Sequence, residues 1–369
     1  MTAAPEPSPL LGLPGAVAGR DADAGVAAHY GDPVREQRTI AAADAVVDLS
    51  HRGVIAVTGA DRGSWLDSLL SQRLGHLAPG EAAEALLLDP AGRVEHAAAI
   101  VDDGTTTWLV VEGGEATAFT SFLDRMRFML RVEVADRTAD TAVLGAFGPV
   151  AALDAVRPLI WLDPWATGSA GGATAARGEH PGAEWSFRLL LLPRTALAQV
   201  ADLARAGRVR VAGTTALESL RIAAWRPRFA AEVDERTIPH ELDWLRSAVH
   251  LNKGCYRGQE TVAKVFNLGR PPRRLVQLDL DGSEGVLPEP GAPVLLGETQ
   301  VGRVTSAAIH HEQGPIALAV IKRSVPADAA LTVQATDALV AAAQIAIVPS
   351  DAGPAVAVPR LPRLGVVSR

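Results

Sequence analysis

The chain has 369 residues, of which 48% are hydrophobic, so it is long enough for two or three domains with real cores and cannot be disordered throughout. Its formal net charge of −7 argues against a dedicated nucleic-acid-binding protein, which would carry a basic balance. A single cysteine, Cys255, excludes an intramolecular disulfide and a zinc site built from several cysteines of one chain.

The ends of the chain predict neither a membrane span nor a secretory signal. Residues 1–20 lack a basic start followed by an unbroken apolar stretch. The most apolar C-terminal run, residues 338–348, is interrupted by Gln344 and is shorter than the roughly 20 residues that cross a bilayer. We therefore expect a cytoplasmic protein without a membrane partner.

The first 40 residues are rich in Ala, Pro, Gly and Asp and are predicted to form a mobile lead-in. Regular structure is expected from about residue 41. Apolar runs of strand length predict strands at 45–49, 54–57, 86–88, 108–111, 143–147 and 189–192.

Helical periodicity predicts several helices between these strands. We expect the first to be capped by Asp61 and to end at Gly75. Later helices are expected around 119–126 and 197–203. Another should begin near Thr215, where Thr215 and Glu218 have the spacing of a capping box. Residues 168–182 are rich in Gly and Ala and predict a surface loop.

The pattern changes from helical to strand-like near residue 271. Pro271 and Pro272 stop the preceding helix, and the chain beyond them alternates as strands do. The predicted organisation is therefore a lead-in (1–40), an α+β region (41–270), a small β domain (271–349) and a tail (350–369).

The segment Lys253-Gly254-Cys255-Tyr256-Arg257-Gly258-Gln259-Glu260 carries the clearest chemical signal. Two glycines bracket the only cysteine, and a helical pattern begins directly after them. A helix N-terminus and nearby Lys253 or Arg257 would favour the reactive thiolate. The alternative is a buried, inert cysteine that serves as a small core residue.

This segment resembles the K-G-C-Y-x-G-Q-E signature of the YgfZ family, which is related to the aminomethyltransferase (T-protein) of the glycine cleavage system. The resemblance extends to residues 48–53 (DLSHRG), 220–222 and 238–241, and covers about residues 45–350 without the middle loops. It implies an α+β fold: a T-protein-like folate-binding region of two subdomains around a central cavity, followed by a C-terminal β-barrel.

The resemblance also implies a function. The family binds tetrahydrofolate and supports assembly or repair of iron–sulphur proteins, so the expected cofactor is tetrahydrofolate. The expected partners are folate and iron–sulphur client or assembly proteins. The family's cysteine maps to Cys255, which is our candidate catalytic residue.

Two positions depart from the transferase pattern. T-proteins carry an aspartate in a G-G-x-I-D-D-like turn, where this chain has Glu95 and His96 instead. They also carry a pterin-binding glutamate in L-R-L-E-A-G, where this chain has Ala223. Loss of an acid/base group and of a paired acceptor argues against aminomethyl transfer.

Three further residues are candidates for cofactor binding: Arg221, Trp225 and Glu241. Arg221 lies at the edge of an apolar helix face, where either a folate carboxylate or a protein carboxylate can pair with it. Arg270, Arg273 and Arg274 form a basic cluster that is either a solvated patch or a docking site for an acidic group. No metal ligand is predicted.

Three functions remain open from the sequence. The first is a tetrahydrofolate-binding accessory protein for iron–sulphur proteins with a reactive Cys255. The second is a folate-dependent one-carbon transferase of the aminomethyltransferase or demethylase type. The third is a protein of RNA modification, which the arginine cluster favours and the acidic balance opposes.

Overall fold

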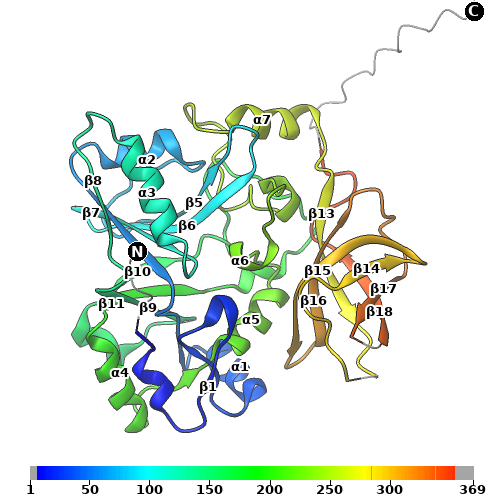
Figure 1. The fold of residues 1–369 in the computed structure, drawn as a ribbon, viewed down its shortest axis with the longest axis horizontal. Helices are drawn as coiled ribbons and strands as arrows, with labels where there is room; N and C mark the ends of the chain where they lie inside the picture. Colours follow the sequence, from blue (N-terminus) through cyan, green and yellow to red (C-terminus); the bar gives the residue numbers. More distant parts are fainter. Residues whose placement is uncertain (1–5, 284, 337, 354–369) are drawn as a thin grey trace, which may run out of the picture.

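A computed structural model describes residues 6–283, 285–336 and 338–353. Two five-stranded sheets form the larger part of the molecule, and a closed barrel stands beside them (Figure 1). The expected α+β class with a C-terminal β-barrel is confirmed. No helix in the described part of the chain is long and apolar enough to cross a membrane.

The first sheet has the order β10-β11-β9-β3-β12, in which only β3 and β12 run parallel. Its strands are β3 (Val46–Asp48), β9 (Thr141–Ala146), β10 (Leu159–Leu162), β11 (Arg188–Pro193) and β12 (Val211–Ala212). Both faces of β9 and β11 are buried, which explains why these segments are almost continuously apolar.

The second sheet has the order β5-β6-β7-β4-β8 and is antiparallel throughout. Its strands are β4 (Gly53–Thr58), β5 (Ala82–Leu88), β6 (Val94–Asp102), β7 (Thr106–Val111) and β8 (Glu133–Asp136). Two helices, α2 (Arg62–Leu69) and α3 (Ala116–Met126), cover one face through Trp65, Leu66, Phe119 and Leu123.

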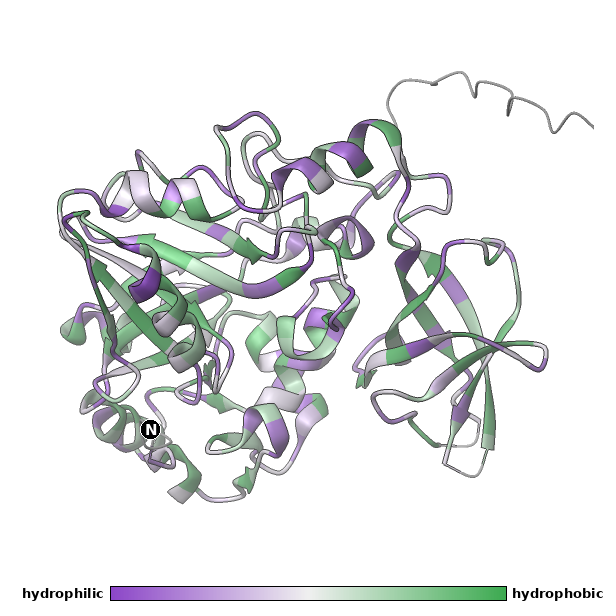
Figure 2. Ribbon diagram, turned by 45° about the horizontal axis from the view of Figure 1, so that its top comes forward, coloured by the Kyte–Doolittle hydropathy of each residue, from purple (hydrophilic) through white to green (hydrophobic). Residues whose placement is uncertain are grey.

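The barrel closes in the order β13-β16-β15-β14-β17-β18. Its strands are β13 (Arg273–Leu280), β14 (Pro293–Leu296), β15 (Thr299–His310), β16 (Gly314–Lys322), β17 (Leu331–Ala335) and β18 (Ala338–Ala346). Alternate residues such as Val276, Leu278 and Val333 are buried inside it. Figure 2 shows apolar residues concentrated in these strands.

The remaining elements connect and cover the sheets. They are η1 (Pro9–Gly12), β1 (Val17–Ala18), η2 (Asp21–Asp23), β2 (Ala27–His29), α1 (Pro33–Ala41), η3 (Ala151–Val156), η4 (Pro181–Glu184), α4 (Ala196–Arg205), α5 (Thr214–Ala223), α6 (Phe229–Glu232), η5 (Pro239–Leu242) and α7 (Gln259–Leu268). Helix α5 packs against both β15 and β16, so it joins the larger region to the barrel.

The prediction of a mobile lead-in is wrong for residues 8–40. Leu10 and Val26 are fully buried, and Leu10 packs in a core with residues of β9, β11 and α4. Helix α1 is capped by the Asp32 side chain, which accepts from the Arg35 amide, and it starts at Pro33. The part of the predicted tail beyond residue 353 lies outside the described residues.

Three predicted helix ends differ from the structure, although Asp61 does occupy the N-cap position of α2. The Asp61 carboxylate binds the Arg131 backbone and guanidinium and not the start of α2. Helix α2 ends at Leu69, well before Gly75. Helix α5 starts at Thr214 without a side-chain cap, because the Glu218 side chain pairs with Arg221.

Candidate functional site

A cavity of about 830 Å³, counting its open mouth, lies between the two sheets. Its walls come from β6 and β7 of one sheet, β10 and β11 of the other, α5, and the segment 226–229 that follows α5. A ligand-sized hollow between two subdomains is a common place for a cofactor.

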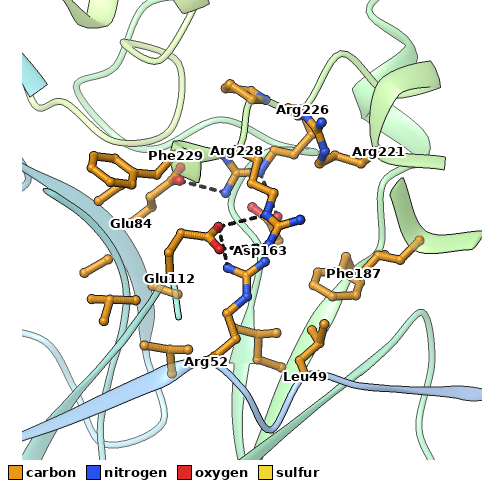
Figure 3. A pocket seen from close by; sticks show the side chains of 18 of the residues that line it. Leu49, Arg52, Glu84, Glu112, Asp163, Phe187, Arg221, Arg226, Arg228 and Phe229 are labelled. Atoms are coloured by element: carbon orange, nitrogen blue, oxygen red, sulfur yellow. Dashed lines mark hydrogen bonds and ion pairs between the residues drawn. The ribbon is translucent and has the colours of Figure 1, made fainter. Parts of the chain in front are cut away.

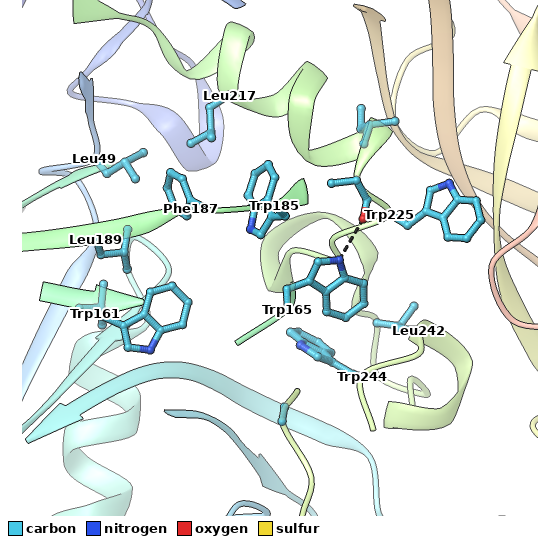
Figure 4. Packing of buried hydrophobic residues seen from close by; sticks show 14 of the residues in the cluster. Leu49, Trp161, Trp165, Trp185, Phe187, Leu189, Leu217, Trp225, Leu242 and Trp244 are labelled. Atoms are coloured by element: carbon cyan, nitrogen blue, oxygen red, sulfur yellow. Dashed lines mark hydrogen bonds between the residues drawn. The ribbon is translucent and has the colours of Figure 1, made fainter. Parts of the chain in front are cut away.

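Aromatic side chains form much of the apolar wall. Trp161, Trp185, Phe187 and Phe229 line the cavity, and Figure 4 shows how closely the first three lie among other buried residues. Small side chains face them from β6, where Ala97 and Ala99 line the cavity. A flat aromatic ring can stack in such a space between large and small side chains.

Buried charges form the polar part of the cavity. The Glu112 carboxylate lies between two guanidiniums, 2.8 Å from Arg52 and 3.0 Å from Arg228 (Figure 3). Burial alone would raise the pKa of Glu112, but the charges of Arg52 and Arg228 lower it to about 2. Glu112 is therefore ionised at neutral pH and fixes both arginines at the cavity wall.

Like Arg52 at its Nε, the cavity residue Arg226 has an unused donor. Its Nη2 and Nε atoms donate to Glu84 and Asp163 at 2.8 and 3.0 Å, whereas the buried Nη1 atom has no partner among the described residues. Two indoles help hold these carboxylates: Trp244 donates to Glu84 and Trp185 to Asp163. An unpaired donor in a buried arginine marks a place where a ligand acceptor would be stabilised.

Arg221 lines the cavity as predicted, but all five of its N–H groups already have partners. They donate to Glu218, to Glu232, to the Ser306 hydroxyl on β15 and to the Arg226 carbonyl. The structural ion pair that the sequence left open is thus the arrangement found. A folate carboxylate would have to replace one of these partners.

Glu241 and Trp225, the other candidates for cofactor binding, do not line this cavity. Glu241 is fully buried and accepts from Arg273 at 2.7 Å. The Trp225 indole donates to Gln277 on β13 at 2.6 Å. Both side chains join the larger region to the barrel, so their role in cofactor binding stays a prediction without support from this geometry.

In the cysteine loop, Lys253 anchors the backbone. Its buried ammonium donates to the carbonyls of Asp67, Leu70 and Gln72 at the end of α2, and it lies 3.4 Å from the Asp67 carboxylate. These carbonyls lie in the last turn of α2 and just beyond it, where the helix leaves them unpaired. Lys253 therefore ties the cysteine loop to the end of α2.

The other residues of the motif fix the same loop. Tyr256 is buried with its ring 5.3 Å from the Lys253 ammonium, and burial raises its pKa to about 12. Arg257 pairs with Glu95 on β6, and Gln259 donates to the Lys253 carbonyl. Glu260 is exposed.

Gly258 is the loop position that requires a glycine. It has φ of 82°, and an added Cβ would lie 2.6 Å from the Asp89 carbonyl oxygen. Gly254 has neither a positive φ nor an atom within 4 Å of an added Cβ. The predicted need for two special glycines holds only for Gly258.

Cys255 is exposed, which excludes the buried, inert alternative. It does not line the central cavity, and helix α7 begins four residues later at Gln259. The motif thus holds an accessible thiol on a fixed loop apart from the hollow. Among the described residues no group of three or more His, Cys, Asp or Glu is placed to hold a metal ion.

The residues that depart from the transferase pattern, Glu95 and His96, make contacts outside the cavity. Glu95 pairs with Arg257. His96 stacks on Phe119, and its Nδ1 lies 2.6 Å from the Glu115 carboxylate. Neither side chain lines the cavity, and Ala223 supplies no acceptor.

The arginine cluster at the domain boundary is not a basic surface patch. Arg273 pairs with Asp234 and Glu241, and Arg274 is fully buried with Gln344 as a partner. Only Arg270 of the three is exposed. The RNA hypothesis thereby loses the observation that motivated it.

Sequence reasoning missed most of the charged residues of the cavity. Glu84, Glu112, Asp163, Arg52 and Arg228 were not singled out. The signal that was available is the density of arginines in 221–228, because three guanidiniums next to apolar elements need buried partners.

The fold, two sheets around a cavity with a barrel beside them, is that of the glycine cleavage T-protein type. Residues 15–160 match the family described as the GCVT N-terminal domain, and residues 273–349 match the glycine cleavage T-protein C-terminal barrel domain. A solved structure, the glycine cleavage system aminomethyltransferase T from Bartonella henselae, superposes with a TM-score of 0.73 over 94% of this chain and 97% of that chain. At 19% identity this likeness shows the fold alone.

Curated relatives identify the family to which the chain belongs. An aminomethyltransferase of Synechococcus elongatus is 30% identical over 71% of this chain and 72% of its own length. One of Rubrobacter xylanophilus is 29% identical over 76% of each. A putative chloroplastic transferase of Arabidopsis thaliana is 26% identical, and the match spans 61% of that protein. The chain belongs to the glycine cleavage T-protein (aminomethyltransferase) family.

Proposed function

We propose that this protein is a cytoplasmic tetrahydrofolate-binding accessory protein that supports assembly or repair of iron–sulphur proteins. It binds the folate in the central cavity and presents Cys255 to a client or assembly protein. The observation that carries the folate part is the unpaired Nη1 of buried Arg226 in a cavity with aromatic walls. A pterin is a flat ring with hydrogen-bond acceptors, so it suits both features.

The iron–sulphur part rests on the motif around Cys255. The resemblance of residues 253–260 to the YgfZ signature motivates it. The contacts of Lys253, Tyr256, Arg257 and Gly258 support it, because they fix the loop while leaving the thiol accessible. An exposed sulphur on a fixed loop suits contact with another protein better than chemistry inside a closed hollow.

Calorimetric titration with tetrahydrofolate tests the folate part. Ala97→Leu places extra volume in the cavity and is expected to weaken binding at least tenfold, because the added methyl groups occupy ligand space. Ala135→Leu, on the exposed part of β8, is the matched control and should bind as the wild type does. Cys255→Ala should also leave binding unchanged, since Cys255 does not line the cavity.

The role of the thiol needs a separate experiment. In a strain that lacks the gene, Cys255→Ala is expected to restore iron–sulphur enzyme activity poorly, whereas the wild type restores it fully. Equal restoration by the two proteins would remove Cys255 from the proposal while leaving folate binding in place.

A folate-dependent one-carbon transferase is the second candidate. The relatives named aminomethyltransferase favour it. The engaged Glu95 and the alanine at 223 oppose it, since neither offers an acid/base group or a pterin acceptor in the cavity. Transfer of a one-carbon unit to tetrahydrofolate from any of a panel of N-methyl or aminomethyl donors would decide in its favour.

A further inference from the structure

A carboxylate from the N-terminal segment reaches the wall of the central cavity. Asp23, at the end of η2, lines the cavity and lies 2.7 Å from the Arg228 Nη2 atom and 3.3 Å from the His51 Nε2 atom. Arg228 also binds Glu112 through two bonds of 3.0 Å. The guanidinium therefore has one carboxylate from the cavity wall and one from a separate surface segment.

The segment that carries Asp23 is otherwise mostly exposed. Within residues 20–24 only Asp23 is not exposed. The base of this tip is closed by the bond from the Gly19 amide to the Val26 carbonyl, and Gly25 has φ of 95°. The Asp23 carboxylate is thus the main contact of the tip with the cavity, between two glycines that allow the backbone to rotate.

Arg228 does not depend on Asp23 for a partner. If the Asp23 carboxylate left, Glu112 would still pair with Arg228, so no buried charge would be left alone. His51 is buried, and neither of its ring nitrogens makes a well-aligned hydrogen bond with a described residue. Arg228 and His51 can therefore bind another anion in place of the Asp23 carboxylate.

Space for that anion continues beyond Asp23. A second hollow, lined by residues of the N-terminal segment, α1, α5 and β15, shares Asp23, Thr214 and Glu218 with the central cavity. Asp23 thus lines both hollows, at the place where they adjoin. A ligand that displaced its carboxylate would have the second hollow directly beside it.

We propose that Arg228 and His51 form a binding subsite for a carboxylate of the ligand, and that Asp23 is an internal occupant which this carboxylate displaces. The inference rests on the proposed folate binding and deepens it. A folate has a flat ring at one end and a glutamate at the other. The ring stacks in the aromatic cavity, the glutamate carboxylate takes the place of Asp23, and residues 20–24 move outward.

Two probes distinguish binding of the ring from binding of the glutamate: tetrahydrofolate, and a tetrahydropterin that lacks the glutamyl part. Asp23→Asn removes the competing charge and should tighten tetrahydrofolate binding about tenfold, which corresponds to the loss of one charge-assisted contact. Binding of the tetrahydropterin should not change. Asp21→Asn, on the same exposed tip, is the matched control and should affect neither probe.

The possible outcomes are distinct. Tetrahydrofolate binding that is equal in the wild type and Asp23→Asn, or an equal gain for both probes, overturns the subsite. Binding of neither probe to any variant overturns the folate function itself, and the subsite with it.

Limited trypsin digestion gives a check without ligand. Cleavage after exposed Arg20 should be several times faster in Asp23→Asn than in the wild type, because the tip has lost its anchor. An unchanged rate would show that Asp23 does not hold the tip.

Discussion

At the scale of single residues, the contacts in the structure explain the cysteine motif. Each of Lys253, Tyr256, Arg257 and Gly258 makes a contact that shapes the backbone around Cys255. The sequence identified the motif but left open whether its thiol is accessible or buried. It did not show the anchoring contacts of Lys253, because the carbonyls that bind its ammonium lie more than 180 residues earlier and no local pattern shows such a partner.

The two glycines beside Cys255 predict different outcomes for the same substitution. Gly258→Ala should destabilise the protein by about 1–3 kcal/mol, because the new Cβ meets the Asp89 carbonyl oxygen and φ is positive. Gly254→Ala should change stability by less than about 0.5 kcal/mol, since the added methyl group meets nothing. Urea unfolding followed by tryptophan fluorescence measures both, and equal losses would contradict the assigned role of Gly258.

At the scale of elements, strands were easier to predict than boundaries. Runs such as 143–147 and 189–192 coincide with buried strands, because continuously apolar stretches are stable in a sheet whose two faces are both covered. Helix ends were less accurate, since Asp61 and Glu218 bind arginines instead of helix amides. The N-terminal elements were missed because their composition resembles a linker, although Asp32-Pro33 is a helix-start signal that was available.

The buried N-terminal segment predicts a stability effect far from any cavity. Leu10→Ala should cost about 2–5 kcal/mol, because Leu10 is fully buried in the core beside β9, β11 and α4. Leu11→Ala is the control and should cost less, since Leu11 is only partly buried. Chemical denaturation compares the two variants, and a Leu10→Ala protein as stable as the wild type would contradict the packing.

The whole molecule is held together by polar contacts that cross from the larger region to the barrel. Arg221 and Glu232 both bind the Ser306 hydroxyl on β15, and Glu241 binds Arg273 at the start of β13. The change of pattern near residue 271 predicted a separate β domain, and the family resemblance implied the two subdomains and the barrel. These contacts were not predictable, because each joins charged residues that the sequence alone presents as surface groups.

This coupling predicts a single unfolding transition. All seven tryptophans lie in residues 65–244, and of these Trp225 contacts the barrel through Gln277. Their fluorescence therefore reports mainly on the larger region, whereas far-UV circular dichroism also reports on the barrel. The two signals should have the same midpoint in urea. Ser306→Ala should lower that common midpoint, and separate midpoints in the wild type would show that the barrel unfolds on its own.

The walls of the central cavity come from chain positions as far apart as Asp23 and Trp244. During synthesis, a ribosome must therefore release about two thirds of the polypeptide before the last wall residue can join the first. No shorter nascent chain contains a complete cavity. Under the proposed function, folate can therefore bind only to chains that have passed this length, and it cannot guide the earliest stages of their folding.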